Sequence, residues 1–183
     1  MTDSSGNKVT YNYNQTKGTL DSVVDPKGKQ TSYGYDNNDR LTSVSKVVSG
    51  ETVRNSYTYE NDRIKTINHN DFYYKFDYDN LGNVSEVKVK ENRSLIKNTY
   101  AAEAGGGLNI KTNKLQESEY GNGQKVGYQY DILDRIMART YNGSTRHWYT
   151  YDSAGNLGYH DDIVNGVKYR YVYDLANRLS EVR

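Results

Sequence analysis

The sequence contains no cysteine, one proline, one tryptophan and two phenylalanines among its 183 residues. Without cysteine the chain forms no disulfide and offers no thiolate to a metal ion. Only His69, His147 and His160 remain for imidazole chemistry. The single proline, Pro26, lies in a predicted turn, as a sheet protein requires, because proline cannot donate to a strand ladder.

Long hydrophobic runs and an excess of one charge are also missing. The longest apolar stretches, such as residues 44–48, are far shorter than the ~20 residues that cross a bilayer as a helix, so we expect no membrane span. The formal charge of +1 gives no electrostatic reason to expect nucleic acid as a partner. Residues 1–6 lack the basic and apolar regions of a signal peptide.

Tyrosine, in contrast, is abundant, and most of its 20 copies fall in a repeat in which an aromatic residue, any residue, tyrosine and an acidic or amide residue come in succession. The second tyrosines are about 22 residues apart, with one gap of 52 residues between Tyr78 and Tyr130. Inside this gap Tyr100 keeps the spacing but leads into residues 101–107, which lack the motif. The repeats read Tyr11-Asn12-Tyr13-Asn14, Tyr33-Gly34-Tyr35-Asp36, Tyr57-Thr58-Tyr59-Glu60, Phe76-Asp77-Tyr78-Asp79, Tyr128-Gln129-Tyr130-Asp131, Tyr149-Thr150-Tyr151-Asp152 and Tyr171-Val172-Tyr173-Asp174.

A second regularity follows each tyrosine-aspartate (YD) pair. Four residues after the second tyrosine stands Asp, Gly or Asn, the types that tolerate a left-handed backbone, and six residues after it stands an aliphatic residue. We expect the repeat to be held together by Tyr35, Asp36, Asp39, Arg40, Leu41, Tyr78, Asp79, Gly82, Val84, Tyr130, Asp131, Asp134, Arg135, Ile136, Tyr151, Asp152, Gly155, Leu157, Tyr173, Asp174, Asn177, Arg178 and Leu179.

The motif predicts its own hairpin. Residues 36–39 favour a type I turn closed by a left-handed residue in a G1 bulge, which makes a three-residue loop. This loop places Asp36 opposite Arg40 and Tyr35 opposite Leu41 on adjacent strands. Which face of the sheet is interior stays open, because Leu41 and Val44 would fall on opposite faces of a regular strand.

Further turn signals lie between the repeats, at Pro26-Lys27-Gly28, Ser49-Gly50, Asn70-Asp71, Asn122-Gly123, Asn142-Gly143 and Asn165-Gly166. Each unit of about 22 residues therefore holds two strands and two tight turns. We expect an all-β fold in which residues 1–183 form one array of about eight hairpins, degenerate at about residues 90–120. Since a lone hairpin is marginal in water, neighbouring repeats must pair through their main chains to stabilise the array.

The copies at Tyr35-Asp36, Tyr151-Asp152 and Tyr173-Asp174, each followed by an aliphatic residue, resemble the YD repeat of RHS-repeat proteins. That family includes bacterial RHS polymorphic toxins, wall-associated proteins, shell subunits of insecticidal toxin complexes, and teneurins. The resemblance implies an extended, curved antiparallel sheet, a partial spiral of a hollow shell that encloses a C-terminal toxin. The self-cleaving core segment of the bacterial members has no counterpart here, so we expect neither a protease nor a toxin domain in this chain.

The residues that could carry more specific chemistry have simpler structural interpretations. Repeated aspartates beside turns are more economically turn acceptors than paired catalytic carboxylates. His147, Trp148 and Tyr149 could form a ligand site, but packing is the simpler interpretation. His160-Asp161-Asp162 matches no known metal-ligand spacing, and Gly105-Gly106-Gly107 lacks the context of a phosphate loop, which favours a flexible insertion. We therefore predict no catalytic, cofactor or metal residues.

The functional expectation is a non-catalytic β-scaffold from a secreted or surface protein. Its expected partner is the C-terminal toxin domain of the same parent chain, and the exposed sheet edges allow self-association. The alternative is a carbohydrate-binding, wall-binding or adhesion repeat, although a single tryptophan argues against the glycan-binding modules rich in that residue. The sequence leaves open the parent length, the toxin, the oligomeric state and any glycan or protein ligand.

Overall fold

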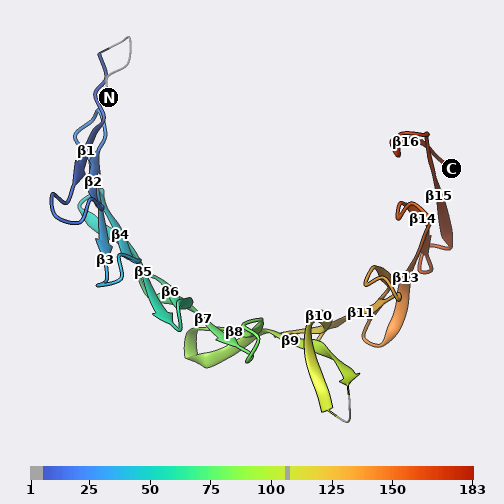
Figure 1. The fold of residues 1–183 in the computed structure, drawn as a ribbon. Coiled ribbons are helices and arrows are strands. Elements are labelled where there is room, and N and C mark those ends of the chain that lie inside the picture. The colour runs from blue at the N-terminus through green and yellow to red at the C-terminus, as the bar shows by residue number, and fades with distance from the viewer. Residues whose placement is uncertain (1–5, 106–107) are drawn as a thin grey trace. The chain divides into compact units, whose positions relative to one another are not determined.

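A computed structural model describes residues 6–105 and 108–183, and within it the side chains of residues 103–111 are not described. The chain forms sixteen β-strands and one short 3-10 turn at Lys90–Asn92. Strand order in the sheet follows chain order from β1 to β16 (Figure 1). Every strand pair with a described register is antiparallel, and the predicted all-β fold of tandem hairpins is confirmed.

The contacts divide the chain into two compact units, residues 1–77 with 87–93 and residues 78–86 with 94–183. Strand β8 spans Val84–Val89 and contributes to both units. The other strands of the first unit are β1 Thr10–Tyr13, β2 Leu20–Val24, β3 Gln30–Tyr35, β4 Leu41–Val48, β5 Glu51–Glu60, β6 Arg63–His69 and β7 Phe72–Tyr78. Those of the second unit are β9 Arg93–Gly105, β10 Leu108–Tyr120, β11 Lys125–Tyr130, β12 Ile136–Tyr141, β13 Ser144–Tyr151, β14 Leu157–Asp162, β15 Val167–Tyr173 and β16 Leu179–Val182.

The turns between repeats form where the sequence predicts them. Ser49 and Gly50 both have positive φ (52° and 85°), as do Asn142 and Gly143 (49° and 80°). Two successive left-handed residues make the type I′ turn whose twist matches that of the flanking strands. Asp25 caps the loop that contains Pro26, because its Oδ1 accepts the backbone N–H groups of Lys27 and Lys29.

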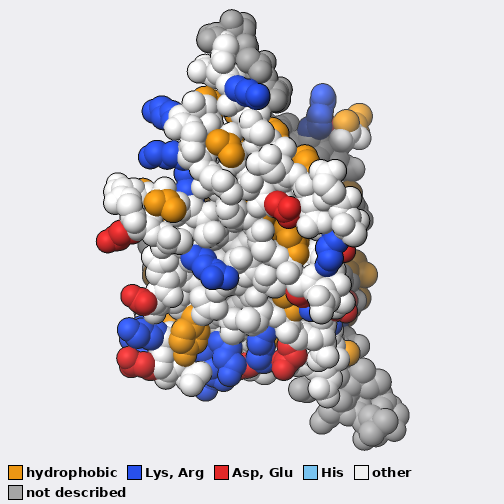
Figure 2. Space-filling model, turned by 90° about the vertical axis from the view of Figure 1, so that its left-hand side faces the viewer, with side chains coloured by type: hydrophobic (Ala, Val, Ile, Leu, Met, Phe, Trp, Pro, Cys, Tyr) orange, Lys and Arg blue, Asp and Glu red, His pale blue; other side chains and the backbone are white. Residues whose placement is uncertain are grey.

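Little of the chain is fully buried. Among the described residues only Val89, Val126 and Ala138 are buried apolar side chains, and Ser22 and Ser118 are buried polar ones. On the face shown in Figure 2, hydrophobic side chains lie singly among polar and charged groups and form no continuous patch. Since the described strands belong to one sheet and few of their side chains are buried, the fold must be stabilised within the plane of the sheet.

Candidate functional site

The aspartate of the repeat organises the turn that follows it. Oδ1 of Asp36 accepts the backbone N–H groups of Asn38 (2.9 Å) and Arg40 (3.0 Å), and Oδ2 accepts Nε of Arg40 (2.8 Å). The backbone N–H of Asp36 donates to the carbonyl of Arg40, and that of Asp39 donates to the carbonyl of Asp36. These bonds form the predicted three-residue loop. The same Oδ1 pattern recurs at Asp79, Asp131, Asp152 and Asp174.

Because these aspartates accept several hydrogen bonds, their charged form is favoured. The Arg135 side chain and then its backbone N–H hold the pKa of Asp131 below its usual value. At Asp174 the backbone N–H of Arg178 and then its guanidinium lower the pKa in the same way. The acids of the motif therefore act as hydrogen-bond acceptors within the turn.

The fourth position after the second tyrosine adopts a left-handed backbone. Asp39, Asp134 and Asn177 have φ of 57°, 65° and 56°, and Gly82 and Gly155 have φ of 86° and 87°. Asp and Asn tolerate this conformation and glycine adopts it without steric cost. The mixture of Asp, Gly and Asn at this position follows from one backbone requirement.

Two repeats close their turns differently, as their lengths require. After Tyr59 the loop has two residues, Asn61 and Asp62, both with positive φ (49° and 60°), and Glu60 pairs with Arg63 in the register. After Tyr13 the loop is longer, and Oδ1 of Asn14 accepts the backbone N–H groups of residues 16 and 17. The repeat therefore keeps its strand register through changes in loop length.

The second tyrosine is opposite the aliphatic residue of its own repeat, with a bulge between this pair and the next one. Tyr35 is opposite Leu41, whereas Tyr33 is opposite Val44, and the register shifts between Gly34 and Tyr35. Directly opposed residues share a face of the sheet. The bulge therefore puts Leu41 and Val44 on the same face, together with both tyrosines, where a regular strand would separate them.

The hydroxyl of the second tyrosine connects consecutive repeats. It donates to the carbonyl oxygen of the aliphatic residue in the preceding repeat, so the bond crosses from one hairpin to the next. The described donor and acceptor pairs are Tyr35 to Leu20 (3.1 Å), Tyr59 to Leu41 (2.7 Å), Tyr100 to Val84 (3.0 Å), Tyr130 to Leu115 (2.8 Å), Tyr151 to Ile136 (2.8 Å) and Tyr173 to Leu157 (3.1 Å). Burial raises the pKa of Tyr100, Tyr130 and Tyr151, so these phenols stay protonated and remain donors.

The arginine of the motif extends this connection. The Arg40 guanidinium lies 4.6 Å from the ring centre of Tyr59, and that of Arg135 lies 4.3 Å from the ring centre of Tyr151. In each case the arginine covers the tyrosine of the following repeat. Successive turns also contact each other through ion pairs, such as Arg40 with Asp62 (2.6 Å) and Lys17 with Asp39 (3.0 Å).

Tyr100 makes the contacts of a repeat tyrosine although its sequence motif is missing. It is opposite Leu115 in the register, as Tyr35 is opposite Leu41, and its hydroxyl donates to Val84. Between them the long hairpin of β9 and β10 replaces the short turn and extends away from its neighbours in Figure 1. Gly106 and Gly107 of the predicted insertion lie outside the described residues.

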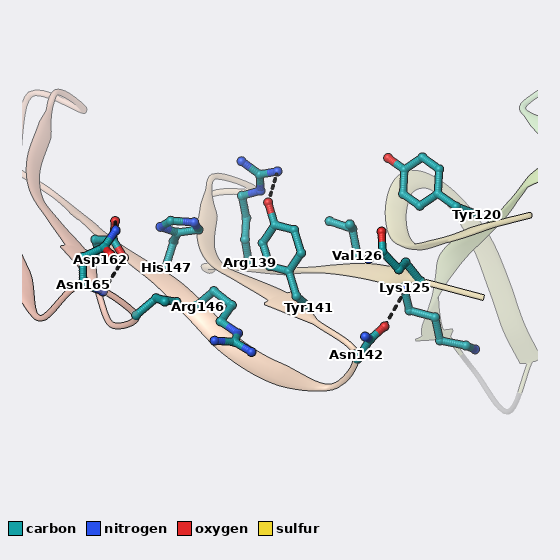
Figure 3. A pocket seen from close by; sticks show the side chains of 12 residues that line it. Tyr120, Lys125, Val126, Arg139, Tyr141, Asn142, Arg146, His147, Asp162 and Asn165 are labelled. Carbon is teal, nitrogen blue, oxygen red and sulfur yellow. Dashed lines mark hydrogen bonds between the residues drawn. The ribbon is translucent and has the colours of Figure 1, made fainter. Parts of the chain in front are cut away.

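The second unit also contains an open cavity of about 640 Å³ beside β12 and β13, which sequence reasoning missed. In Figure 3 the side chains of Arg139, Tyr141 and His147 point to one side of the strands, and Lys125 and Arg146 point to the other. Asp162 accepts the Asn165 side-chain amide (2.7 Å), which is the main cause of its lowered pKa, and the neighbouring His147 ring adds to that lowering.

The sequence candidates near this cavity are separated by strand alternation. Trp148 is opposite Ala138 and Asp161, whereas His147 and Tyr149 are on the other face with His160. The three consecutive residues 147–149 therefore do not line one pocket. His160 and Asp162 share the face of His147, and Asp161 does not. Within residues 6–105 and 108–183 no three His, Cys, Asp or Glu side chains converge closely enough to hold a metal.

Comparisons with known proteins agree with the repeat geometry. Residues 18–52 match the family model of the RHS repeat, which confirms the resemblance predicted from the motif. No curated protein matches the sequence. In the part of the chain that the structure describes, no helix is long and apolar enough to cross a membrane.

Several solved structures share the fold. The crystal structure of TcdB2-TccC3-Cdc42 is similar with a TM-score of 0.67 and 12% identity, and the match covers 95% of this chain and 10% of that chain. TcdB2-TccC3 without its hypervariable C-terminal region gives a TM-score of 0.68 at 12% identity, with the same coverage. TcdB2-TccC3 gives 0.65 at 14% identity, again over 95% of this chain and 10% of that one. The chain thus spans about a tenth of these proteins, and the likeness is one of fold.

Proposed function

We propose, from the RHS repeat matched at residues 18–52, that this chain is a stretch of non-catalytic β-scaffold which in its parent protein encloses or presents a C-terminal toxin. The observation that carries the scaffold role is the hydroxyl bond to the preceding repeat, which is described for five second tyrosines and for Tyr100. Such a bond joins neighbouring hairpins without requiring a shared core. It suits a wall built by adding repeats in one direction.

The motif acids support a structural role. Asp131 accepts two backbone N–H groups and the Arg135 guanidinium, so most of its acceptor positions serve the turn. A general base or nucleophile needs a free lone pair aimed at a substrate. The aspartates that recur in every standard turn are therefore engaged as scaffold.

The cargo is proposed by analogy with the similar structures. TcdB2-TccC3 was solved without a hypervariable C-terminal region, so that protein has such a region as a separable part. By this analogy the partner of the present scaffold is a variable toxin domain of the same parent, which acts after secretion or at the cell surface. The end strands β1 and β16 are the two edges in the strand order, and we propose that they allow self-association, since an unpaired edge is a template for another strand.

A carbohydrate-binding or adhesion role is the second candidate. Trp148 is 38% exposed and is on the face opposite Tyr149, where its indole ring is available to a sugar ring. A glycan array on the 183-residue chain and on Trp148→Ala distinguishes the two roles. Specific binding that is lost in the variant would favour the glycan-binding role over the scaffold.

The scaffold proposal is tested by limited proteolysis of the natural gene product that contains this chain. A double variant, Tyr130→Phe and Tyr151→Phe, removes two bonds between repeats, and Tyr128→Phe with Tyr171→Phe is the control. We expect the region after residue 183 to be protected in the wild type and in the control, and to be cleaved faster in the double variant. Equal cleavage in all three proteins, or a downstream region without a toxin domain, would contradict the enclosing role.

A further inference from the structure

The most specific unassigned feature is a pair of imidazoles on neighbouring strands of the second unit. Nδ1 of His147 on β13 lies 3.1 Å from Nε2 of His160 on β14. The sequence separates the two residues by a turn and half of each strand, and the hairpin brings them together on one face. Two of the three histidines of the chain thus meet at one point.

The spacing of the two nitrogens suits a shared metal ion. Imidazole nitrogens bind Zn²⁺ at about 2.0–2.1 Å, so two neighbouring ligands on one ion lie about 2.9–3.4 Å apart. The observed 3.1 Å is within that range. Imidazole is a preferred donor for zinc, copper and nickel. In the metal-free form one ring donates a hydrogen bond to the other. To bind the metal through both nitrogens, the donor ring must carry its proton on its other nitrogen.

The ring of His160 is already held in place for such a role. Tyr149 stacks on it with ring centres 4.8 Å apart and planes inclined by 15°, and Tyr169 stacks on it at 5.7 Å and 22°. Groups that fix the orientation of a metal ligand raise its affinity for the metal. Both histidines are half-buried, and His147 lines the open cavity, from which water can reach the remaining coordination positions.

The charges around the pair are mixed. Asp162 is directly opposite His147 on the same face and two residues after His160, so its negative charge lies beside the pair and favours a cation there. Arg139 is opposite His147 on the other side, where it donates to the Tyr141 hydroxyl (3.1 Å), and its charge weakens the attraction for a cation.

We propose that His147 and His160 bind one divalent transition-metal ion, such as Zn²⁺ or Cu²⁺, through Nδ1 and Nε2 respectively. Water fills the open positions on the cavity side. Asp162 adds negative charge while its carboxylate stays bonded to Asn165. The site would tie β13 to β14 on the face that carries Tyr149.

The test is calorimetric titration of the 183-residue chain, without a histidine tag, with zinc chloride. His147→Phe and His160→Phe remove the ligand nitrogens and keep an aromatic ring in the stack, and His69→Phe on β6 is the matched control. We expect one equivalent of zinc, an affinity loss of at least about tenfold in either site variant, and no change in the control. Asp162→Asn should weaken binding by a smaller factor.

Pulsed electron paramagnetic resonance of the copper-loaded wild type provides a readout that does not depend on the variants folding. Two imidazole nitrogens from two rings should couple to the copper ion. Coupling to a single ring, zinc affinity equal to wild type in both site variants, or binding that is lost only in His69→Phe would each overturn the proposal.

Discussion

The hydroxyl bond between repeats can be tested at a single atom. Tyr59→Phe removes the hydroxyl that donates to the Leu41 carbonyl at 2.7 Å and leaves the ring, over which Arg40 lies, in place. A neutral hydrogen bond contributes about 0.5–1.5 kcal/mol to stability. Tyr59 is half-buried, so water can reach the abandoned carbonyl and the full penalty of an unsatisfied acceptor is avoided. We expect the free energy of unfolding to fall by about 1 kcal/mol.

Tyr57→Phe is the matched control, because Tyr57 is on the same strand and the same face and is also half-buried. Its hydroxyl makes no hydrogen bond within the described residues, so its loss should cost less than about 0.5 kcal/mol. Urea unfolding followed by far-ultraviolet circular dichroism gives the global comparison. Because repeat arrays can unfold in segments, hydrogen exchange of the β4 and β5 amides gives the local one. Equal losses for the two variants would refute the proposed connection between repeats.

Three further predictions concern the turn. Gly155→Val should lower the free energy of unfolding by about 1–2 kcal/mol because φ is +87°, whereas Gly155→Asn should cost less, since Asn177 has φ 56° at the equivalent position; thermal unfolding measures both, and equal losses would contradict the backbone argument. Arg135→Gln should destabilise by about 0.5–1 kcal/mol more than Arg178→Gln, because the Arg135 side chain is 28% exposed beneath a tyrosine ring and that of Arg178 is 81% exposed; urea midpoints that shift equally would count against it. The pKa of Asp131 lies below its ordinary 3.8, so the stability that its charge contributes is present above that pH and is lost as the pH falls through the lowered pKa; the urea midpoint of Asp131→Asn should therefore fall less than that of wild type between pH 5 and pH 2, and parallel curves would argue against the linkage.

The sequence predicted the local geometry because the repeat encodes it in short-range chemistry. An aspartate that accepts its own turn amides and a residue that tolerates positive φ define the loop, and the loop defines the register. Tyr35 is therefore opposite Leu41 as expected. Repetition strengthens the inference, because each copy tests the same backbone requirement with a different residue.

The contacts between repeats were harder to predict, since they depend on the bulge. One extra residue in β4 moves Leu41 onto the face of Val44. The two-residue alternation of a regular strand would instead predict opposite faces for these residues. The same bulged pairing lets Tyr100 match Leu115 across a long hairpin. The spacing of Tyr100 was the sequence signal for this repeat. Its aliphatic partner, Leu115, lies far beyond the usual six positions, so the motif could not indicate it.

The histidine pair was missed for a different reason. His147 and His160 are diagonal neighbours, because His147 is opposite Asp162 and Tyr149 is opposite His160. Their contact depends on the exact length of the β13–β14 hairpin, where a register shift falls between Thr150 and Tyr151. A sequence pattern that scans for ligands close together in the chain does not detect such a pair.

Because few side chains are buried, the repeats are held together mainly by polar contacts. Val89, Val126 and Ala138 are the only buried apolar residues described, so area burial concentrated in one core does not hold the array together. Neighbouring hairpins are instead joined by a main-chain ladder, in six described cases by a tyrosine hydroxyl bond, and in two by an arginine over the next ring. These contacts are nearest-neighbour interactions, so breaking one should lower the stability of the adjacent hairpins and leave that of distant hairpins unchanged. Hydrogen exchange on Tyr59→Phe should therefore show faster opening in β3 to β6 and unchanged opening in β13 to β16.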